Sequence, residues 1–142
     1  IRELLSFEPT STGTDIAQAL QYFSNAQKRH CTAFLISDFI GNTQLDQPLM
    51  IASNRHELNA IQIYDRREQE LPNIGLVKFR DAETGEDLWV DTSVGSTREA
   101  YARAWQDNLL AMEQLFTRIG VKHVSVRTDE DYVKALMHLF RC

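Results

Sequence analysis

The sequence predicts a single α/β domain, residues 1–142, with a doubly wound, mainly parallel β-sheet, and three observations support this class. Residues 32–37 form a short, uncharged and largely apolar run, typical of a strand buried on both faces of a helix-flanked sheet. A second apolar run at residues 58–64 follows after a short helical segment, which is the order of a right-handed βαβ unit. The length of 142 residues and the hydrophobic share of 43% suit one domain with an ordinary core.

Composition argues against several classes of function. The net charge of −5 and the scattered basic residues argue against a nucleic-acid partner. No apolar run approaches the roughly 20 residues of a membrane span, so no membrane segment is expected in this stretch. Cys31 and Cys142 lack the spacing of a disulfide framework or a zinc site. Cys31 is expected to be a small apolar filler, and the cysteine usage favours a reducing, cytoplasmic setting.

The amino-terminal part predicts a loop followed by an amphipathic helix. Residues 1–13 are polar and rich in turn-forming residues. Thr14 or Asp15 is then expected to cap a helix that ends in the polar stretch 25–30. Apolar residues recur there at helical spacing, namely Ile16, Leu20 and Phe23.

The middle of the chain predicts the βαβ unit and then a β-hairpin. Gly41 turns the chain into a short helix near residues 45–54, which connects the two apolar runs. The charged segment 66–74 is expected to be a loop. Residues 76–80 and 87–90 flank a turn in which Gly85 suits a positive φ, so an inserted hairpin interrupts the α/β alternation.

The carboxyl-terminal part predicts a long helix, a strand and a last helix. The long helix covers residues 97–118 and ends at Gly120 as its C-cap. Residues 123–127 read as a strand, and Thr128 or Asp129 is expected to cap the last helix. Its expected buried face is Val133, Leu136, Met137 and Phe140, and three further aromatic residues are expected in the core, namely Trp89, Trp105 and Phe116.

Thr14 and Asp38 are the candidate metal ligands. Both lie in loops that are expected at the carboxyl edge of the sheet, where open α/β sheets bind ligands. A hydroxyl and a carboxylate are hard oxygen donors that suit Mg²⁺ or Ca²⁺. The alternative from spacing alone is that Thr14 caps a helix and Asp38 closes a turn.

The residues around these positions resemble known segments. Residues 13–16 and 35–39 resemble the second and third metal-site segments of a von Willebrand factor A-like domain. Arg55-His56-Glu57-Leu58, Leu71-Pro72 and the turn at residues 81–86 resemble a bacterial family of unknown function. That family has von Willebrand A-like domains and is linked to MoxR-type AAA+ ATPases.

This resemblance implies a von Willebrand A-like, Rossmann-like sheet with a metal-ion-dependent adhesion site. Thr14 and Asp38 would form only part of that site, with Ser37 and Asp65 as its rim. The Asp-x-Ser-x-Ser segment of such domains does not occur in these residues. We therefore expect an amino-terminally truncated domain without its first strand, with further ligands upstream. Mg²⁺ or Mn²⁺ is expected in the full-length protein and no cofactor in this fragment, which is expected to self-associate through an exposed sheet edge.

Three hypotheses of function follow. The first is a non-enzymatic interaction module that works with a MoxR-type AAA+ ATPase, as the resemblance implies. The alternative is a Mg²⁺-dependent α/β enzyme of phosphoryl chemistry that uses Asp38 and Asp65, although no phosphate-binding loop is recognisable. The third is a structural domain whose acidic turn binds a partner without metal through Asp81, Glu83 and Glu86. The simpler alternative for that turn is a solvated charged loop.

Overall fold

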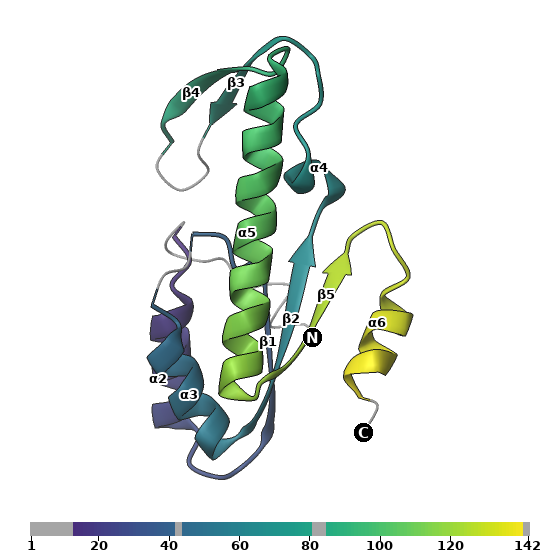
Figure 1. Ribbon diagram of the computed structural model, residues 1–142. Helices are drawn as coiled ribbons and strands as arrows, with labels where there is room; N and C mark the ends of the chain where they lie inside the picture. The colour runs from purple at the N-terminus through teal and green to yellow at the C-terminus, as the bar shows by residue number, and fades with distance from the viewer. Residues whose placement is uncertain (1–12, 42–43, 81–84, 141–142) are drawn as a thin grey trace, which may run out of the picture.

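The computed structural model describes residues 13–41, 44–80 and 85–140 and has a mixed α/β architecture (Figure 1). Its elements in chain order are α2 (Ile16–Ala26), β1 (Thr32–Ser37), α3 (Asp46–Arg55), β2 (Glu57–Tyr64), α4 (Arg66–Gln69), β3 (Leu76–Arg80), β4 (Asp87–Asp91), α5 (Gly95–Ile119), β5 (Lys122–Arg127) and α6 (Tyr132–Leu139). A parallel sheet has the order β1-β2-β5, and β3 and β4 form a separate antiparallel pair. The α/β class, the parallel sheet and the inserted hairpin are therefore confirmed.

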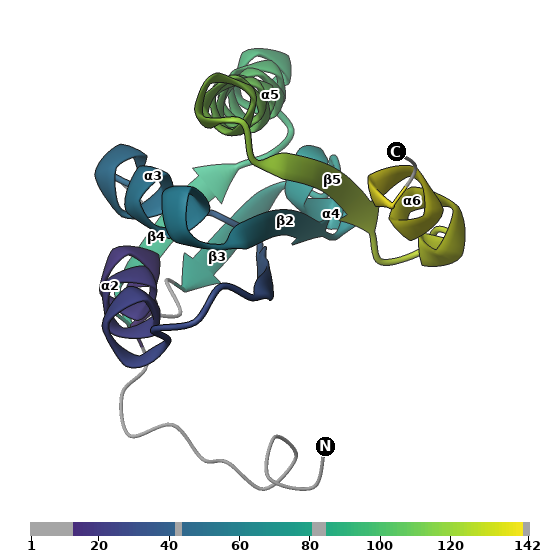
Figure 2. The ribbon, with the colours of Figure 1, turned by 90° about the horizontal axis from the view of Figure 1, so that it is seen from below.

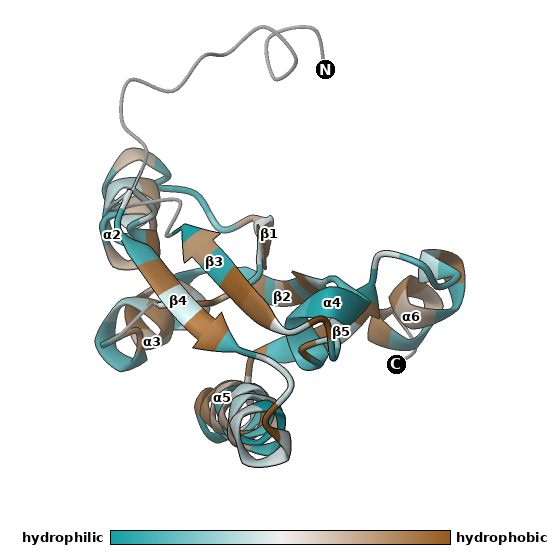
Figure 3. Ribbon diagram, turned by 90° about the horizontal axis from the view of Figure 1, so that it is seen from above, coloured by the Kyte–Doolittle hydropathy of each residue, from teal (hydrophilic) through white to brown (hydrophobic). Residues whose placement is uncertain are grey.

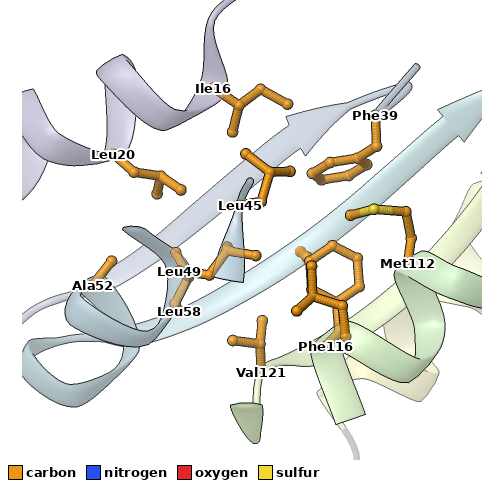
Figure 4. Close-up of a cluster of buried hydrophobic side chains, with 12 residues drawn as sticks. Ile16, Leu20, Phe39, Leu45, Leu49, Ala52, Leu58, Met112, Phe116 and Val121 are labelled. Atoms are coloured by element: carbon orange, nitrogen blue, oxygen red, sulfur yellow. The ribbon is translucent and has the colours of Figure 1, made fainter. Parts of the chain in front are cut away.

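Helices cover the parallel sheet on both faces, but unequally (Figure 2). The larger core lies between the sheet and the three helices α2, α3 and α5. Phe39 and Phe116 meet edge to face at its centre, with their ring centroids 5.2 Å apart (Figure 4). Their neighbours in this core include Ile16, Leu20, Leu45, Leu49, Leu58, Met112 and Val121.

The opposite face of the sheet is covered by the short helix α6 alone among the described elements. A small cluster forms there from Ile61, Val126 and Leu139. Phe34 and Ile36 of β1 lie on the same face and remain 46% and 58% exposed. The expectation that β1 is buried on both faces is therefore wrong, because β1 is an edge strand and α6 is too short to cover it. The strand buried on both faces is β2.

The structure decides between the two cap residues expected for α2 and confirms the cap residue expected at the end of α5. Asp15 caps α2, because its carboxylate accepts a hydrogen bond from the backbone N–H of Gln18 at 2.8 Å. Thr14 therefore has no capping role. Gly120 ends α5 with a φ of 80°, as predicted, since a left-handed residue at this position favours glycine.

The last helix begins later than the sequence suggested. Asp131 caps α6 by accepting a hydrogen bond from the Val133 N–H at 3.0 Å. Thr128 and Asp129 do not cap it, because the Thr128 hydroxyl binds Asp65 and Asp129 pairs with Arg127. The expected buried face of the last helix is largely wrong. Of its four residues, Leu136 is partly buried, and the others are exposed, namely Val133, Met137 and Phe140.

The β3–β4 hairpin projects beyond the carboxyl ends of the parallel strands, beside the first turns of α5 (Figure 1). The segment before it contains the short helix α4, where a loop was predicted. Thr92, which is fully buried, holds the base: its hydroxyl donates to the Gly75 carbonyl at 2.7 Å and accepts from the Ile74 N–H at 3.1 Å. Arg98 of α5 donates to the Thr92 carbonyl at 2.6 Å. Polar contacts thus fix where the hairpin leaves the body.

Candidate functional site at the carboxyl end of the sheet

Asp38 closes a tight turn directly after β1. Its carboxylate accepts hydrogen bonds from the Ile40 N–H at 3.1 Å and from the Ser37 hydroxyl at 3.4 Å. The Ser37 hydroxyl oxygen in turn accepts from the Phe39 N–H at 3.1 Å. Phe39 has a φ of 57°, which is uncommon for a bulky residue, and its side chain is fully buried. The buried ring and the two side-chain acceptors together hold this turn in place.

Thr14 lies near this turn but not in it. Thr14 and Gly41, which is three residues after Asp38, line the same polar hollow of about 640 Å³. Asp38 is not part of the lining of that hollow. The loop that carries Thr14 and the loop after β1 therefore border the same hollow.

Thr14 and Asp38 are the two predicted metal ligands among the described residues. A divalent ion takes about six oxygen ligands, and Thr14 and Asp38 offer two side chains. Among residues 13–41, 44–80 and 85–140, no group of three or more His, Cys, Asp or Glu side chains is placed to hold a metal ion. Metal binding at Thr14 and Asp38 stays a prediction for a longer chain.

Asp65, expected at the rim of the site, links the ends of two strands. Its carboxylate accepts from the Arg67 N–H at 2.8 Å and from the Thr128 hydroxyl at 3.0 Å. These hydrogen bonds, the first of them above all, lower the pKa of Asp65. Glu68 completes a capping box by accepting from the Asp65 N–H. Asp65 thereby fixes α4 over the carboxyl end of β2.

Gln62 is a buried polar residue that the sequence reading missed. It is 6% exposed, and its amide donates to the Asp38 carbonyl at 3.3 Å. Its side-chain oxygen accepts from the Ser125 hydroxyl at 3.2 Å. The signal in the sequence is a side-chain amide inside the apolar run of β2, which Gln62 shares with the buried Asn59. Gln62 connects all three parallel strands at their carboxyl ends.

A pocket of about 400 Å³ lies between α4, the segment that follows it, β3 and α5. Five of its lining residues are apolar, and the charged lining residues together with Tyr101 are called its rim, namely Arg66, Arg67, Glu70 and Tyr101. Burial, and then the negative charge of Glu68, raise the pKa of Tyr101, so its hydroxyl keeps its proton at neutral pH. The wall residues are Leu71, Pro72, Ile74, Val77 and Phe79. The sequence reading had no signal for this pocket, because its parts come from four separate segments.

Residues of high and low hydropathy alternate along the two hairpin strands (Figure 3), which separates an apolar face from a charged face. Directly paired residues of antiparallel strands point to the same side of the sheet, and the register pairs Val77 with Val90 and Phe79 with Leu88. Val77 and Phe79 line the pocket, so these four residues form the apolar hairpin face. Phe79 is 39% and Leu88 65% exposed, so the outer half of this face is uncovered.

The other hairpin face carries an ion-pair network around Asp87. Lys78 and Arg80 approach the Asp87 carboxylate at 2.6 Å and 2.9 Å, and these contacts, Arg80 first, lower the pKa of Asp87. Lys78 also lies 5.9 Å from the ring of Trp89. Trp89 was expected in the core and is 61% exposed, so that expectation is wrong. Successive side chains of β4 alternate between the two faces of the hairpin, and this alternation places Trp89 on the exposed charged face.

The acidic turn of the hairpin lies largely outside the described residues. Asp81 and Glu83 fall in the segment 81–84, which the structure does not describe. Glu86 is described and exposed. The proposal of an acidic interaction surface at this turn stays a prediction.

Cys31 has a specific partner at the opposite, amino-terminal edge of the sheet. Its Sγ lies 3.6 Å from Nδ1 of His56, which is 3% exposed and whose ring centroid lies 4.7 Å from that of Phe23, with the two rings tilted by 55°. Cys31 was expected to be a small apolar filler. It is half-buried directly before β1 and, in addition, contacts His56.

Residues 1–109 match the family model described as a protein of unknown function, DUF58, and the chain belongs to this family. The chain is 30% identical over 135 residues to the uncharacterized protein MAV169 of Mycobacterium avium, covering 94% of this chain and 78% of that protein. It is 32% identical over 127 residues to the uncharacterized protein Rv1480 of Mycobacterium tuberculosis, covering 88% of this chain and 39% of that protein. The comparison with solved structures found no significant match.

These comparisons confirm the bacterial family of unknown function that the sequence resembles. Within the part of the chain that the structure describes, no helix combines the length and hydrophobicity needed to cross a membrane.

Proposed function

We propose that this chain is a non-enzymatic protein-interaction module that binds its partner with the hairpin end of the molecule. The observation that carries this proposal is the apolar hairpin face, whose outer residues Phe79 and Leu88 remain exposed in the half of the hairpin away from its base. A contiguous exposed apolar surface of this kind marks interaction sites in soluble proteins.

The environment of the hairpin supports a role in binding. A two-stranded hairpin by itself is marginally stable in water, and this one is anchored at its base by Thr92 and Arg98. Among the described elements, β3 and β4 pair only with each other, so both outer edges are open. A partner can therefore cover the apolar face and pair with an edge at the same time.

The resemblance suggests the partner, a MoxR-type AAA+ ATPase. It also suggests a metal-dependent part of the interaction at Thr14 and Asp38, with Mg²⁺ or Mn²⁺ held by further ligands in a longer chain. A cation with an open coordination position accepts a carboxylate from a partner protein. The hairpin and this edge lie at the same end of the parallel strands, so one partner can reach both.

The engaged state of Asp65 favours this role over the alternative of a Mg²⁺-dependent enzyme, which would use Asp38 and Asp65. Asp65 caps α4 and accepts a hydrogen bond from Thr128, so both of its carboxylate oxygens already have donors. A general base at this position would have to give up one of these bonds first.

The test measures binding between the purified chain and a purified MoxR-type ATPase from the same organism, by biolayer interferometry with and without Mg²⁺. The double variant Phe79→Asp/Leu88→Asp places charges on the apolar hairpin face and is expected to weaken binding at least roughly tenfold. Tyr22→Asp is the matched control, because Tyr22 is 75% exposed on α2 and lies outside this face.

Both variants need to keep the wild-type circular dichroism spectrum and melting temperature. Binding that the double variant leaves unchanged would contradict the hairpin as the interaction surface. No binding by the chain, and none by a longer protein that contains it, would contradict the ATPase as the partner. Loss of binding on chelation would support the metal-dependent part.

A further inference from the structure

The pocket beside the hairpin combines an apolar interior with cationic groups at its rim. Arg66 and Arg67 line it, and among the described residues neither side chain donates a hydrogen bond or forms an ion pair. The positive charge of Arg67 makes a small contribution to the lowered pKa of nearby Asp65, whose carboxylate already accepts hydrogen bonds from a backbone N–H and a hydroxyl. Two guanidinium groups at the mouth of a pocket are therefore available to an incoming anion.

The net charge of the pocket lining is small and positive. The lining residues contain two arginines and one glutamate, Glu70, which gives a net charge of 2 − 1 = +1. This local excess stands against the net charge of −5 of the whole chain. A carboxylate is attracted to this rim, and the glutamate opposes it.

The interior of the pocket selects for an apolar group. Its volume of about 400 Å³ is within the usual size of ligand sites, and five of its lining residues are apolar, namely Leu71, Pro72, Ile74, Val77 and Phe79. Tyr101 adds a protonated hydroxyl at the side formed by α5. The site therefore offers an apolar cavity next to hydrogen-bond donors for an anion.

From this arrangement we infer that the pocket binds a peptide segment of the partner protein in which a bulky apolar side chain neighbours an acidic residue. The apolar side chain enters the cavity, and the carboxylate binds the guanidinium groups of Arg66 and Arg67. Charge-assisted hydrogen bonds between guanidinium and carboxylate provide direction as well as affinity. This inference rests on the proposed function and names the chemistry of the partner.

A peptide fits the site better than a free small carboxylate because the apolar surface extends beyond the pocket. Phe79 belongs to both the pocket wall and the apolar hairpin face, which continues to Leu88. Ile74, at the other side of the pocket, is 67% exposed. A ligand of pocket size leaves Leu88, which is outside the pocket lining, in water, whereas an extended chain covers it.

The probe is the blocked peptide acetyl-Gly-Phe-Asp-Leu-Gly-amide, added at millimolar concentration to the isotope-labelled chain and followed by NMR. The amide resonances of Val77, Phe79 and Tyr101 are expected to shift. The same peptide with Asn in place of Asp is expected to bind roughly tenfold more weakly, since it lacks the charge. Octanoate, an apolar carboxylate without a peptide backbone, is the third ligand.

Variants of the rim test the role of charge. Arg66→Gln and Arg67→Gln are each expected to weaken binding of the acidic peptide several-fold, and Glu70→Gln is expected to strengthen it. Arg103→Gln is the control on the exposed surface of α5, outside the pocket lining. An increase in affinity caused by Glu70→Gln is a result that mere loss of folding cannot produce.

Each outcome decides the inference. Equal binding of the acidic and amide peptides would overturn the role of the carboxylate. Octanoate binding as tightly as the acidic peptide would overturn the peptide in favour of a small-molecule site. If no ligand shifts the pocket resonances, the inference fails. In that case, weaker binding of the ATPase by the Phe79→Asp/Leu88→Asp variant would still support the proposed function. Binding of the ATPase that this variant leaves unchanged would contradict the hairpin as the interaction surface as well.

Discussion

Apolar side chains are buried in the body of the molecule but exposed at its hairpin end. In the body, β2 buries Leu58, Ala60 and Ile61 between helices on both faces of the sheet. At the hairpin end, residues of equal hydrophobicity such as Phe79 and Leu88 stay in water. The hairpin is held by polar contacts at its base, through Thr92 and Arg98, and not by burial of its faces. The buried core that stabilises the chain and its exposed apolar surface thus lie in different regions, the body and the hairpin end.

The largest expected effect is the loss of an aromatic side chain from the body. Phe116→Ala is expected to lower the free energy of unfolding by about 3–5 kcal/mol, because Phe116 is 2% exposed and packs against Phe39. Leu88→Ala at the hairpin is expected to change it by less than about 0.5 kcal/mol. Urea denaturation followed by circular dichroism measures both. Similar losses for the two variants would remove the distinction between body and hairpin.

A smaller effect is expected where the hairpin joins the body. Thr92→Val keeps the shape of the side chain but leaves the Ile74 N–H without its acceptor, at an expected cost of about 1–3 kcal/mol. Amide hydrogen exchange is expected to increase more in β3 and β4 than in β2. Thr117→Val, at an exposed position of α5, is the control. Uniform loss of protection across the chain would show that the hairpin is not an independently anchored unit.

Exposed β1 offers a comparison within the sheet. Ile36→Lys is expected to change the unfolding free energy by less than about 0.5 kcal/mol, since Ile36 is 58% exposed. The same change is expected to reduce any self-association, because a charge on an exposed edge strand opposes pairing with a second copy. Sedimentation velocity measures the association. Strong destabilisation by Ile36→Lys would show that this face of β1 is covered in solution.

The smallest effect concerns pH. Contacts with Arg80 and Lys78 lower the pKa of Asp87 in the folded chain, and hydrogen bonds from Ser93 lower that of Asp91. A carboxylate whose folded pKa is lowered stabilises above its unfolded value, about 3.9, and loses this contribution as the pH falls through the folded value. The hairpin is therefore expected to loosen below about pH 4 before the core does. NMR resonances of β4 followed through an acid titration measure this, and Asp87→Asn is expected to reduce the response.

The sequence predicted most of the elements because their signals are local. Gly85 and two alternating runs indicated the hairpin, and Gly120 indicated the end of α5. The carboxyl edge with Thr14 and Asp38 followed from the order of strands and loops. Each of these inferences depends on neighbours along the chain, which a sequence displays directly.

The predictions that were wrong concern residues whose burial or hydrogen bonding depends on tertiary contacts. The apolar run of β1 resembles that of β2, but only β2 has strands on both sides, so Phe34 is exposed. Thr128 has the character of a helix cap, and its hydroxyl is instead engaged by Asp65 from another loop. The pocket at Arg66 and Tyr101 joins segments that are far apart in the sequence. No local pattern contains this information.

Amide hydrogen exchange of the chain, alone and in complex with the MoxR-type ATPase, tests most directly whether the hairpin end binds the partner. We expect the complex to protect β3, β4 and the segment from Arg66 to Ile74, which form the hairpin end. Protection confined to the exposed face of β1 and to α6, with the hairpin unchanged, would contradict it.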